Sequence, residues 1–313
     1  MQREQAARQA DSIVRESLDL DIKAPWAGGE TLSIALDVYH SLDADEGVLL
    51  LCAPGGGVNR RYYDMKPDAA GATSFATEMA MRGHTVVAVD PPGVGESTRP
   101  EDGFVLTAEA VADCFHATLQ RLLAARPKLK GRPIIGVGHS AGSMLLTLQQ
   151  VRHRDFESLM LTCFGPSGRP DQFSEAELAA LAAPDLGRSQ LAELTRQHFN
   201  GQAYIDITFR PSATNGGEPL RRVLDKVLTL VALQAMTPGN VAPEIAQIDV
   251  PVMLALGGRD MTGPPHQMPA HFISCRDLYL HIVPDSGHHV FLAAAAPQFY
   301  ERAGRWLSDF SKG

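Results

Sequence analysis

The run Pro133-Ile134-Ile135-Gly136-Val137 leads directly into Gly138-His139-Ser140-Ala141-Gly142, and this junction decides the fold class. The first five residues predict a short buried strand, and residues 143–152 have the composition of a helix. A Gly-x-Ser-x-Gly turn between a strand and a helix is the form of a nucleophile elbow, which exposes the serine hydroxyl at the strand end. Both flanks need glycine, because so tight a turn leaves no room for side chains.

This pattern alone is weak, because a chain with 28 glycines in 313 residues can contain it by chance. Residues 136–141 also fit the dinucleotide-binding pattern Gly-x-Gly-x-x-Ala. Asp155 follows about 20 residues later, where that fold needs a ribose-binding acid. The choice between the two interpretations depends on the rest of the chain.

Size and charge exclude several classes of protein. The 313 residues, 33.7 kDa, predict one large domain or a domain with an insertion. A net charge of −8 argues against binding to a nucleic-acid backbone. No apolar run is as long as a membrane span. The first 20 residues lack the apolar core of a signal peptide, and they predict a polar helix or a lead-in segment.

The four cysteines, Cys52, Cys114, Cys163 and Cys275, are widely separated. None has the spacing of a zinc site, so neither a metal nor another cofactor is expected. Unpaired thiols are typical of a cytoplasmic protein, which is the predicted location. The sequence does not indicate an oligomeric state.

Strands and helices alternate through most of the chain. Apolar runs predict strands at residues 32–39, 47–53, 85–90, 133–137, 156–164, 250–256 and 278–283. Helical patterns lie at residues 69–82, 107–126, 143–152 and 297–310. The first run alternates as an antiparallel edge strand would. The alternation predicts an α/β fold with a doubly wound, mainly parallel sheet.

The alternation stops between residues 166 and 241. That stretch contains helical patterns at 174–183, 189–199 and 218–236 and no clear buried strand. We therefore expect a helical cap inserted into a core formed by residues 1–165 and 242–313.

Four loops follow predicted strands, and in a parallel sheet such loops share the edge where ligands bind. Gly55, Gly56 and Gly57 follow the first parallel strand, and their amides could stabilise an oxyanion together with the amide of Ala141. Residues 90–97, Asp-Pro-Pro-Gly-Val-Gly-Glu-Ser, predict a structural bend beside the site.

The other two loops supply an acid and an imidazole. Asp260 follows a buried strand and two glycines, a position suited to orienting an imidazole. His288 and His289 follow Asp285-Ser286-Gly287 after the last strand. The chain order Ser140, Asp260, His288 is that of a Ser…Asp…His triad on a strand-helix sheet.

With these four motifs in order, residues 18–312 resemble the α/β-hydrolase superfamily, and in particular its serine hydrolases with a helical cap, such as esterases and lactonases. The resemblance implies that Ser140 is the nucleophile, His288 the general base and Asp260 the orienting acid. The usual His-Gly of the oxyanion loop is Pro54-Gly55 here. The backbone role survives this change, and Gly56 and Gly57 remain alternative donors beside Ala141.

Three nearby residues have alternative roles. His289 could be the base, although the family spacing favours the histidine directly after Gly287. Asp285 is the rival acid, and His139 is expected to support the turn around the serine. The dinucleotide interpretation is disfavoured, because strands precede the glycine turn and Asp260 and His288 would have no role in it.

We therefore expect hydrolysis of a carboxylic ester or lactone of a small, hydrophobic substrate, with Tyr62, Tyr63 and Met144 contacting it beside the cap. Thioester hydrolysis, amide or peptide cleavage, carbon–carbon bond hydrolysis and acyl transfer use the same groups and remain alternatives. A further alternative is a binding protein that has the same fold and no catalytic activity. The expected partner is a small molecule, with no nucleic acid and no metal.

Overall fold

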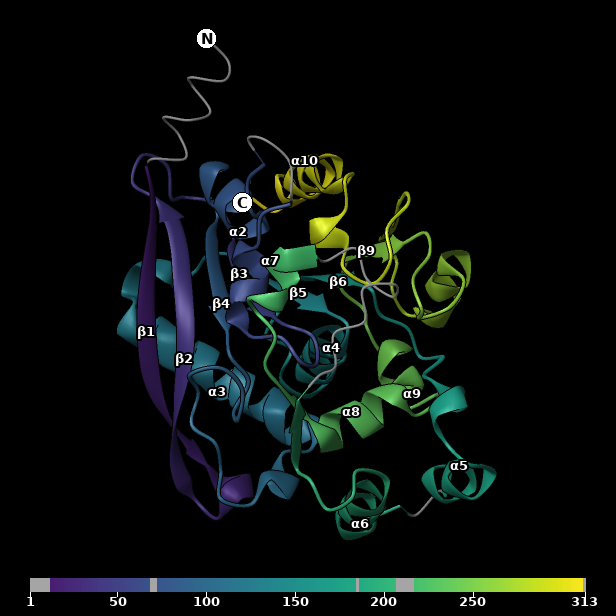
Figure 1. The fold of residues 1–313 in the computed structure, drawn as a ribbon. Coiled ribbons are helices and arrows are strands. Elements are labelled where there is room, and N and C mark those ends of the chain that lie inside the picture. Colours follow the sequence, from purple (N-terminus) through teal and green to yellow (C-terminus); the bar gives the residue numbers. More distant parts are fainter. Residues whose placement is uncertain (1–11, 68–71, 184–185, 207–216, 312–313) are drawn as a thin grey trace.

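The computed structural model describes residues 12–67, 72–183, 186–206 and 217–311 (Figure 1). Its centre is an eight-stranded sheet with the order β1-β2-β4-β3-β5-β6-β9-β10. The strands are β1 (Ile13–Ala24), β2 (Glu30–Ser41), β3 (Leu49–Ala53), β4 (Thr85–Val89), β5 (Ile134–His139), β6 (Ser158–Thr162), β9 (Val252–Gly257) and β10 (Leu278–Val283). The β1–β2 and β2–β4 pairs are antiparallel, and the other pairs are parallel. The predicted mainly parallel α/β sheet is confirmed.

Helices cover both faces of this sheet. They include α2 (Phe75–Met81), α3 (Ala108–Ala125), α4 (Ala141–His153) and α10 (Ala296–Leu307). Successive side chains of a strand point to opposite faces. Leu49 and Leu51 of β3 accordingly belong to the apolar cluster under α3 and α4, whereas Leu50 and Cys52 belong to the cluster under α2 and α10. Burial on both faces explains why this strand is a continuous apolar run.

The prediction for the N-terminus is wrong from residue 13 onward, because β1 begins there; residues 1–11 lie outside the described part. Leu18, Leu20 and Ile22 pack toward the core, and the residues between them are polar. This period of two is the pattern of a strand. Since β1 pairs with β2 along its length, β2 is not the edge strand that the sequence predicts.

Several short elements lie between β6 and β9. They are α5 (Glu175–Leu181), α6 (Arg188–His198), β7 (Tyr204–Asp206), α7 (Gly217–Arg221), β8 (Lys226–Leu228), α8 (Thr229–Met236) and, just beyond residue 241, α9 (Ala242–Ile245). The single helix predicted over 218–236 is wrong, since β8 interrupts it and pairs with β7 in a two-stranded antiparallel sheet. Strands of three residues are too short to show a period in the sequence.

The order of strands creates a crevice at the carboxyl edge of the sheet. β3 lies between β4 and β5, so the connections that follow β3 and β5 leave in opposite directions. Ligands bind at such a switch point in open α/β sheets. The glycine loop after β3 and Ser140 after β5 both lie there. Among the described helices, none combines the length and the apolar composition that crossing a membrane requires.

Candidate active site

Ser140 occupies a strained turn between β5 and α4. Its backbone has φ 52° and ψ −119°, and its amide donates a hydrogen bond to the carbonyl of Thr162 over 2.8 Å. A Cβ at Gly138 would lie 2.4 Å from Cα of Ser143, and a Cβ at Gly142 would lie 2.1 Å from the carbonyl oxygen of Ala53. Both contacts are impossible, so glycine is required on each side of the serine. The turn expected from the sequence is therefore present.

Two further loops bring an imidazole and a carboxylate to this serine. His288, after β10, has Nε2 2.9 Å from Oγ of Ser140. Its Nδ1 lies 2.8 Å from Oδ1 of Asp260, which follows β9. The three residues that the sequence predicted as a triad therefore form one continuous line of hydrogen bonds.

The charge on Asp260 is held in a buried position. Its side chain is only 1% exposed, and burial alone would raise the pKa of its carboxyl group. The hydrogen bond and charge of His288, together with the neighbouring Cys163 thiol, outweigh burial and lower that pKa. An ionised Asp260 accepts a hydrogen bond from Nδ1–H, which holds that proton on Nδ1 and leaves Nε2 of His288 free to accept the serine proton.

The rival groups have other partners. His289 has Nδ1 3.1 Å from the hydroxyl of Tyr62, and burial, with a smaller effect of His288, lowers its pKa to about 3. Asp285 has an exposed side chain, and the guanidinium of Arg259 binds its main-chain carbonyl. Since Asp260 contacts Nδ1 of His288, the geometry gives Asp285 no role in orienting that ring.

His139 braces the loop that carries His288. Its Nε2 lies 2.7 Å from the carbonyl oxygen of His288, and its ring stacks on Tyr62 with 4.4 Å between centroids. Burial lowers the pKa of His139 well below its usual value, with smaller contributions from the other two histidines. A neutral ring must donate from Nε2 to that carbonyl, so His139 connects the serine turn to the histidine loop.

The glycine loop presents amides toward the same edge. Gly57 has φ 81°, a conformation that favours glycine, and its carbonyl accepts a 2.8 Å hydrogen bond from the amide of Asp225. Within the described ranges, no backbone hydrogen bond outside regular helices and strands uses the amides of Gly56, Gly57 or Ala141 as donors. All three remain candidates for binding a substrate oxygen.

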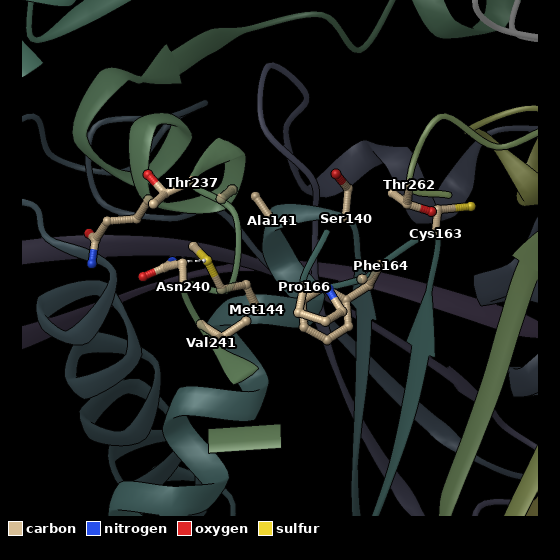
Figure 2. A pocket seen from close by; sticks show the side chains of 13 residues that line it. Ser140, Ala141, Met144, Cys163, Phe164, Pro166, Thr237, Asn240, Val241 and Thr262 are labelled. Carbon is tan, nitrogen blue, oxygen red and sulfur yellow. Dashed lines mark hydrogen bonds between the residues drawn. The ribbon is translucent and has the colours of Figure 1, made fainter. Parts of the chain in front are cut away.

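A cavity that is partly open to solvent lies beside Ser140 and Ala141 (Figure 2). Its apolar lining includes Met144, Phe164, Pro166 and Val241, and its polar lining includes Gln234, Thr237, Asn240 and Thr262. Met144, which the sequence predicts to contact substrate, is one of these lining residues. Figure 2 shows Thr262 and Cys163 near Ser140, with Thr237 and Asn240 at the opposite end.

The prediction that Tyr62 and Tyr63 contact substrate is wrong. Both side chains are fully buried, and neither lines this cavity. The hydroxyl of Tyr63 donates to the carbonyl of Ala53 over 2.7 Å and to that of Val137 over 3.0 Å, so it ties together the ends of β3 and β5. Proximity to the glycine loop in sequence misled the prediction, because both tyrosine side chains point inward.

Most of the lining residues were not predicted as site residues from the sequence. Phe164 and Thr262 follow β6 and β9, so the strand-end argument could have found them. Thr237 and Asn240 lie between α8 and α9, and only the packing of that segment against α4 brings them to the cavity.

Three side chains come close enough to be considered as metal ligands. Atoms of His139, Cys163 and His288 lie within 4.8 Å of one another, the only such group among the described residues. Both ring nitrogens of His288 already have hydrogen-bond partners, Ser140 and Asp260. An ion at this place would have to break the Ser–His–Asp line.

The fold and the arrangement of these loops define an enzyme of the hydrolase class. A family model, the alpha/beta hydrolase family, matches residues 49–302, so the chain belongs to that family. No curated protein matches the sequence.

Solved structures share the fold at low identity. A soluble variant of the monoglyceride lipase from Saccharomyces cerevisiae has a TM-score of 0.69 and 14% identity, with 96% of each chain covered. The monoacylglycerol lipase from Paleococcus ferrophilus has a TM-score of 0.63 and 16% identity, covering 95% of this chain and 99% of that one. The esterase from Thermogutta terrifontis has a TM-score of 0.63 and 18% identity, covering 94% of this chain and 100% of that one. At these identities the likeness concerns the fold.

Proposed function

We propose that this protein is a serine hydrolase that cleaves a carboxylic ester or lactone of a small, largely apolar substrate through an acyl-enzyme on Ser140. The observation that supports it most is the line of hydrogen bonds from Oγ of Ser140 through His288 to the buried carboxylate of Asp260. A serine hydroxyl is a weak nucleophile unless an adjacent base takes its proton.

In this mechanism Ser140 attacks the carbonyl carbon while Nε2 of His288 takes the hydroxyl proton. Asp260 keeps the proton of the ring on Nδ1 and stabilises the imidazolium that forms. The amides of Ala141 and of Gly56 or Gly57 bind the oxyanion. His288 then protonates the leaving oxygen, and water, deprotonated by the same ring, releases the acid.

Two observations support an ester or lactone as the substrate: the lining of the cavity and the similarity in fold to known hydrolases. The cavity beside Ser140 is partly apolar, and proteins of similar fold include monoglyceride lipases and an esterase. Thioester, amide and carbon–carbon hydrolysis need the same groups and are the alternatives.

We also infer that residues 166–241 act as a cap over the site. The four cysteines are free, which supports a reducing, cytoplasmic location.

Replacement of the proposed nucleophile tests this function. Ser140→Ala should lower kcat for p-nitrophenyl esters by roughly 10⁵- to 10⁶-fold and leave the melting temperature close to that of the wild type, because the hydroxyl makes one hydrogen bond in the folded state. Hydrolysis of p-nitrophenyl esters, lactones and thioesters, followed in parallel, ranks the alternatives.

Labelling by a fluorophosphonate supplies the control. The wild type and Ser189→Ala, which changes an exposed serine, should be labelled, whereas Ser140→Ala should not. A folded wild-type protein that takes no label would favour a binding protein over an enzyme.

A further inference from the structure

Two cavities meet at Ala141. The first, which we call the Asn240 cavity, is the one beside Ser140 described above. The second, the Leu145 cavity, is also partly open to solvent, and it is lined by the glycine loop, Leu145 and residues of β8 and α8. α8 lies along both, with Val231 and Ala232 in the Leu145 cavity and Ala235 in the Asn240 cavity. A carbonyl group held at the amide of Ala141 would therefore have one cavity on each side.

The two cavities differ in chemistry. The lining of the Leu145 cavity is aliphatic apart from the glycine loop and Lys226, and the Lys226 ammonium is 2.6 Å from Oδ1 of Asp206. It therefore offers a surface for a hydrocarbon chain and few groups for hydrogen bonds.

The Asn240 cavity instead presents polar groups with unused capacity. Among the described residues, the side-chain amide of Asn240 donates only to Sδ of Met144, at 3.5 Å, and a thioether is a weak acceptor. The Thr237 hydroxyl donates to the carbonyl of Leu233 and can still accept. In the described part of the chain, the hydroxyl of Thr262 has no hydrogen-bond partner. These groups suit a ligand that carries hydroxyl groups.

The position of His288 assigns the two halves of an ester to the two cavities. His288 must deliver its proton to the leaving oxygen, so the alcohol half lies on its side of the carbonyl. Cys163, whose sulfur is within 4.8 Å of a ring nitrogen of His288, lines the Asn240 cavity. Thr262 lines it too, and its amide donates to Oδ1 of Asp260 over 3.2 Å. The Leu145 cavity lies on the side of the glycine loop.

We propose that the substrate is an ester of an aliphatic acid with a polyhydroxy alcohol, that the acyl chain occupies the Leu145 cavity, and that Asn240 selects the alcohol. This proposal rests on the hydrolase function proposed above. The proton that Ser140 gives to His288 passes to the alkoxide oxygen as the ester bond breaks, so the free alcohol leaves from the Asn240 cavity while the acyl group stays on Ser140. One water then yields the acid.

A matched pair of esters tests the alcohol side. Propyl butyrate and 2,3-dihydroxypropyl butyrate differ only in two hydroxyl groups, and acid release from both can be followed by pH-stat titration. For the wild type, kcat/KM should be roughly tenfold or more higher for the dihydroxy ester than for the propyl ester. The propyl ester has no hydroxyl groups, so it leaves the polar groups of the Asn240 cavity without hydrogen bonds. Asn240→Leu should reduce this ratio to about one. Gln247→Leu, the same amide-to-leucine change at an exposed position, should leave the ratio as in the wild type.

A variant in the other cavity should have the complementary effect. Ala232→Leu adds bulk to the Leu145 cavity from a half-buried helical position that tolerates leucine. It should lower the kcat/KM ratio of hexanoate to butyrate esters by roughly tenfold and leave the dihydroxypropyl-to-propyl ratio unchanged. Fluorophosphonate labelling of each variant shows that it is folded with a competent serine.

The outcomes separate the two proposals. An unchanged alcohol ratio in a labelled Asn240→Leu protein overturns the role of Asn240. An exchange of effects, with Ala232→Leu altering the alcohol ratio and Asn240→Leu the acyl ratio, overturns the assignment of the cavities. Failure of the wild type both to take the label and to hydrolyse any ester counts against the hydrolase function itself.

Discussion

Three histidine rings meet beneath the serine turn, and their surroundings give them different chemistry. Burial lowers the pKa of His139 and of His289, so both rings are neutral supports at ordinary pH. Only His288 has both a carboxylate on Nδ1 and a serine hydroxyl on Nε2. These contacts make His288 the candidate base among three neighbouring imidazoles, since the residue type is the same in all three.

A fourth histidine, His84, provides a test of stability against pH. Burial, and less strongly the charge of Arg82, lowers the pKa of His84 from 6.5 to about 4. Between these values the unfolded chain binds a proton that the folded protein does not. The free energy of unfolding should therefore fall as the pH drops from about 6.5 to 4, by up to about 3 kcal/mol from this group.

His84→Asn should make that decline shallower, because asparagine does not titrate and its side-chain oxygen can accept the hydrogen bond that Nδ1 accepts from the amide of Val48. Urea unfolding at several pH values measures the slope. A slope equal to that of the wild type would show that His84 is protonated in the folded state.

Among the elements, the junction of β5 with α4 depends on the absence of side chains. Gly142→Ala would place a Cβ 2.1 Å from the carbonyl oxygen of Ala53, and backbone on both sides leaves nothing that can move cheaply. We expect a loss of several kcal/mol of stability or failure to fold, as for other overpacked core sites. Gly56→Ala is the matched control, since its Cβ would meet nothing within 4 Å. Thermal unfolding compares the two, and a Gly142→Ala protein as stable as Gly56→Ala would contradict the argument.

The bend after β4 is held by a buried ion cluster. The Arg60 guanidinium, 3% exposed, pairs with Asp90, with Glu96 and, over 3.2 Å, with Asp37. Asp90 also accepts hydrogen bonds from the amides of Arg60 and Glu96, at 2.6 and 3.0 Å. In the bend predicted from residues 90–97, ion pairs thus connect β2 and the end of β4 to the turn Arg60–Asp64.

Removal of the cation should be costly. Arg60→Met leaves two buried carboxylates without that partner and should lower the free energy of unfolding by about 3–5 kcal/mol. Glu96→Gln, at an exposed position, should change it by less than about 1 kcal/mol. Denaturant titration distinguishes the two variants, and equal effects would show that the buried carboxylates are not ionised.

On the scale of the whole molecule, the segment between β6 and β9 is tied to the glycine loop. Residues 57–59 and 223–225 pair through Asp225 N–H to the Gly57 carbonyl, 2.8 Å, and Asn59 N–H to the Val223 carbonyl, 3.1 Å. The Asn59 side chain also donates to the Asp225 carboxylate over 3.2 Å. The geometry of the proposed oxyanion amides thus depends on a segment more than 150 residues away in sequence.

Asp225→Pro removes the N–H that holds the Gly57 carbonyl and the side chain that holds Asn59. If the loop provides an oxyanion amide, kcat/KM for esters should fall by about tenfold or more, since misplaced donors stabilise the transition state less. Asp225→Asn keeps the N–H and a side-chain acceptor and should remain near the wild type. If a folded Asp225→Pro protein has the kcat/KM of the wild type, the contact between this segment and the glycine loop does not contribute to ester hydrolysis.

Much of the fold and the candidate site could be predicted from local patterns. Continuous apolar runs identify the parallel strands, because burial on both faces of a sheet demands them. The positions of Ser140, Asp260 and His288 follow from turns and loops whose residue types are constrained locally. The roles of Tyr62 and Tyr63 could not be predicted in the same way, because packing decides them. β1, which lies where a polar helix or a lead-in segment was expected, does show a period of two, so a local pattern for this strand was present in the sequence.

The sequence by itself therefore determined the parallel strands, the serine turn and the order of the loops, since each depends on neighbours along the chain. Tertiary structure alone decided which side chains line the two cavities beside Ala141 and how the segment before β9 reaches the glycine loop. These depend on distances between residues far apart in the chain, and packing, which no local pattern encodes, sets those distances.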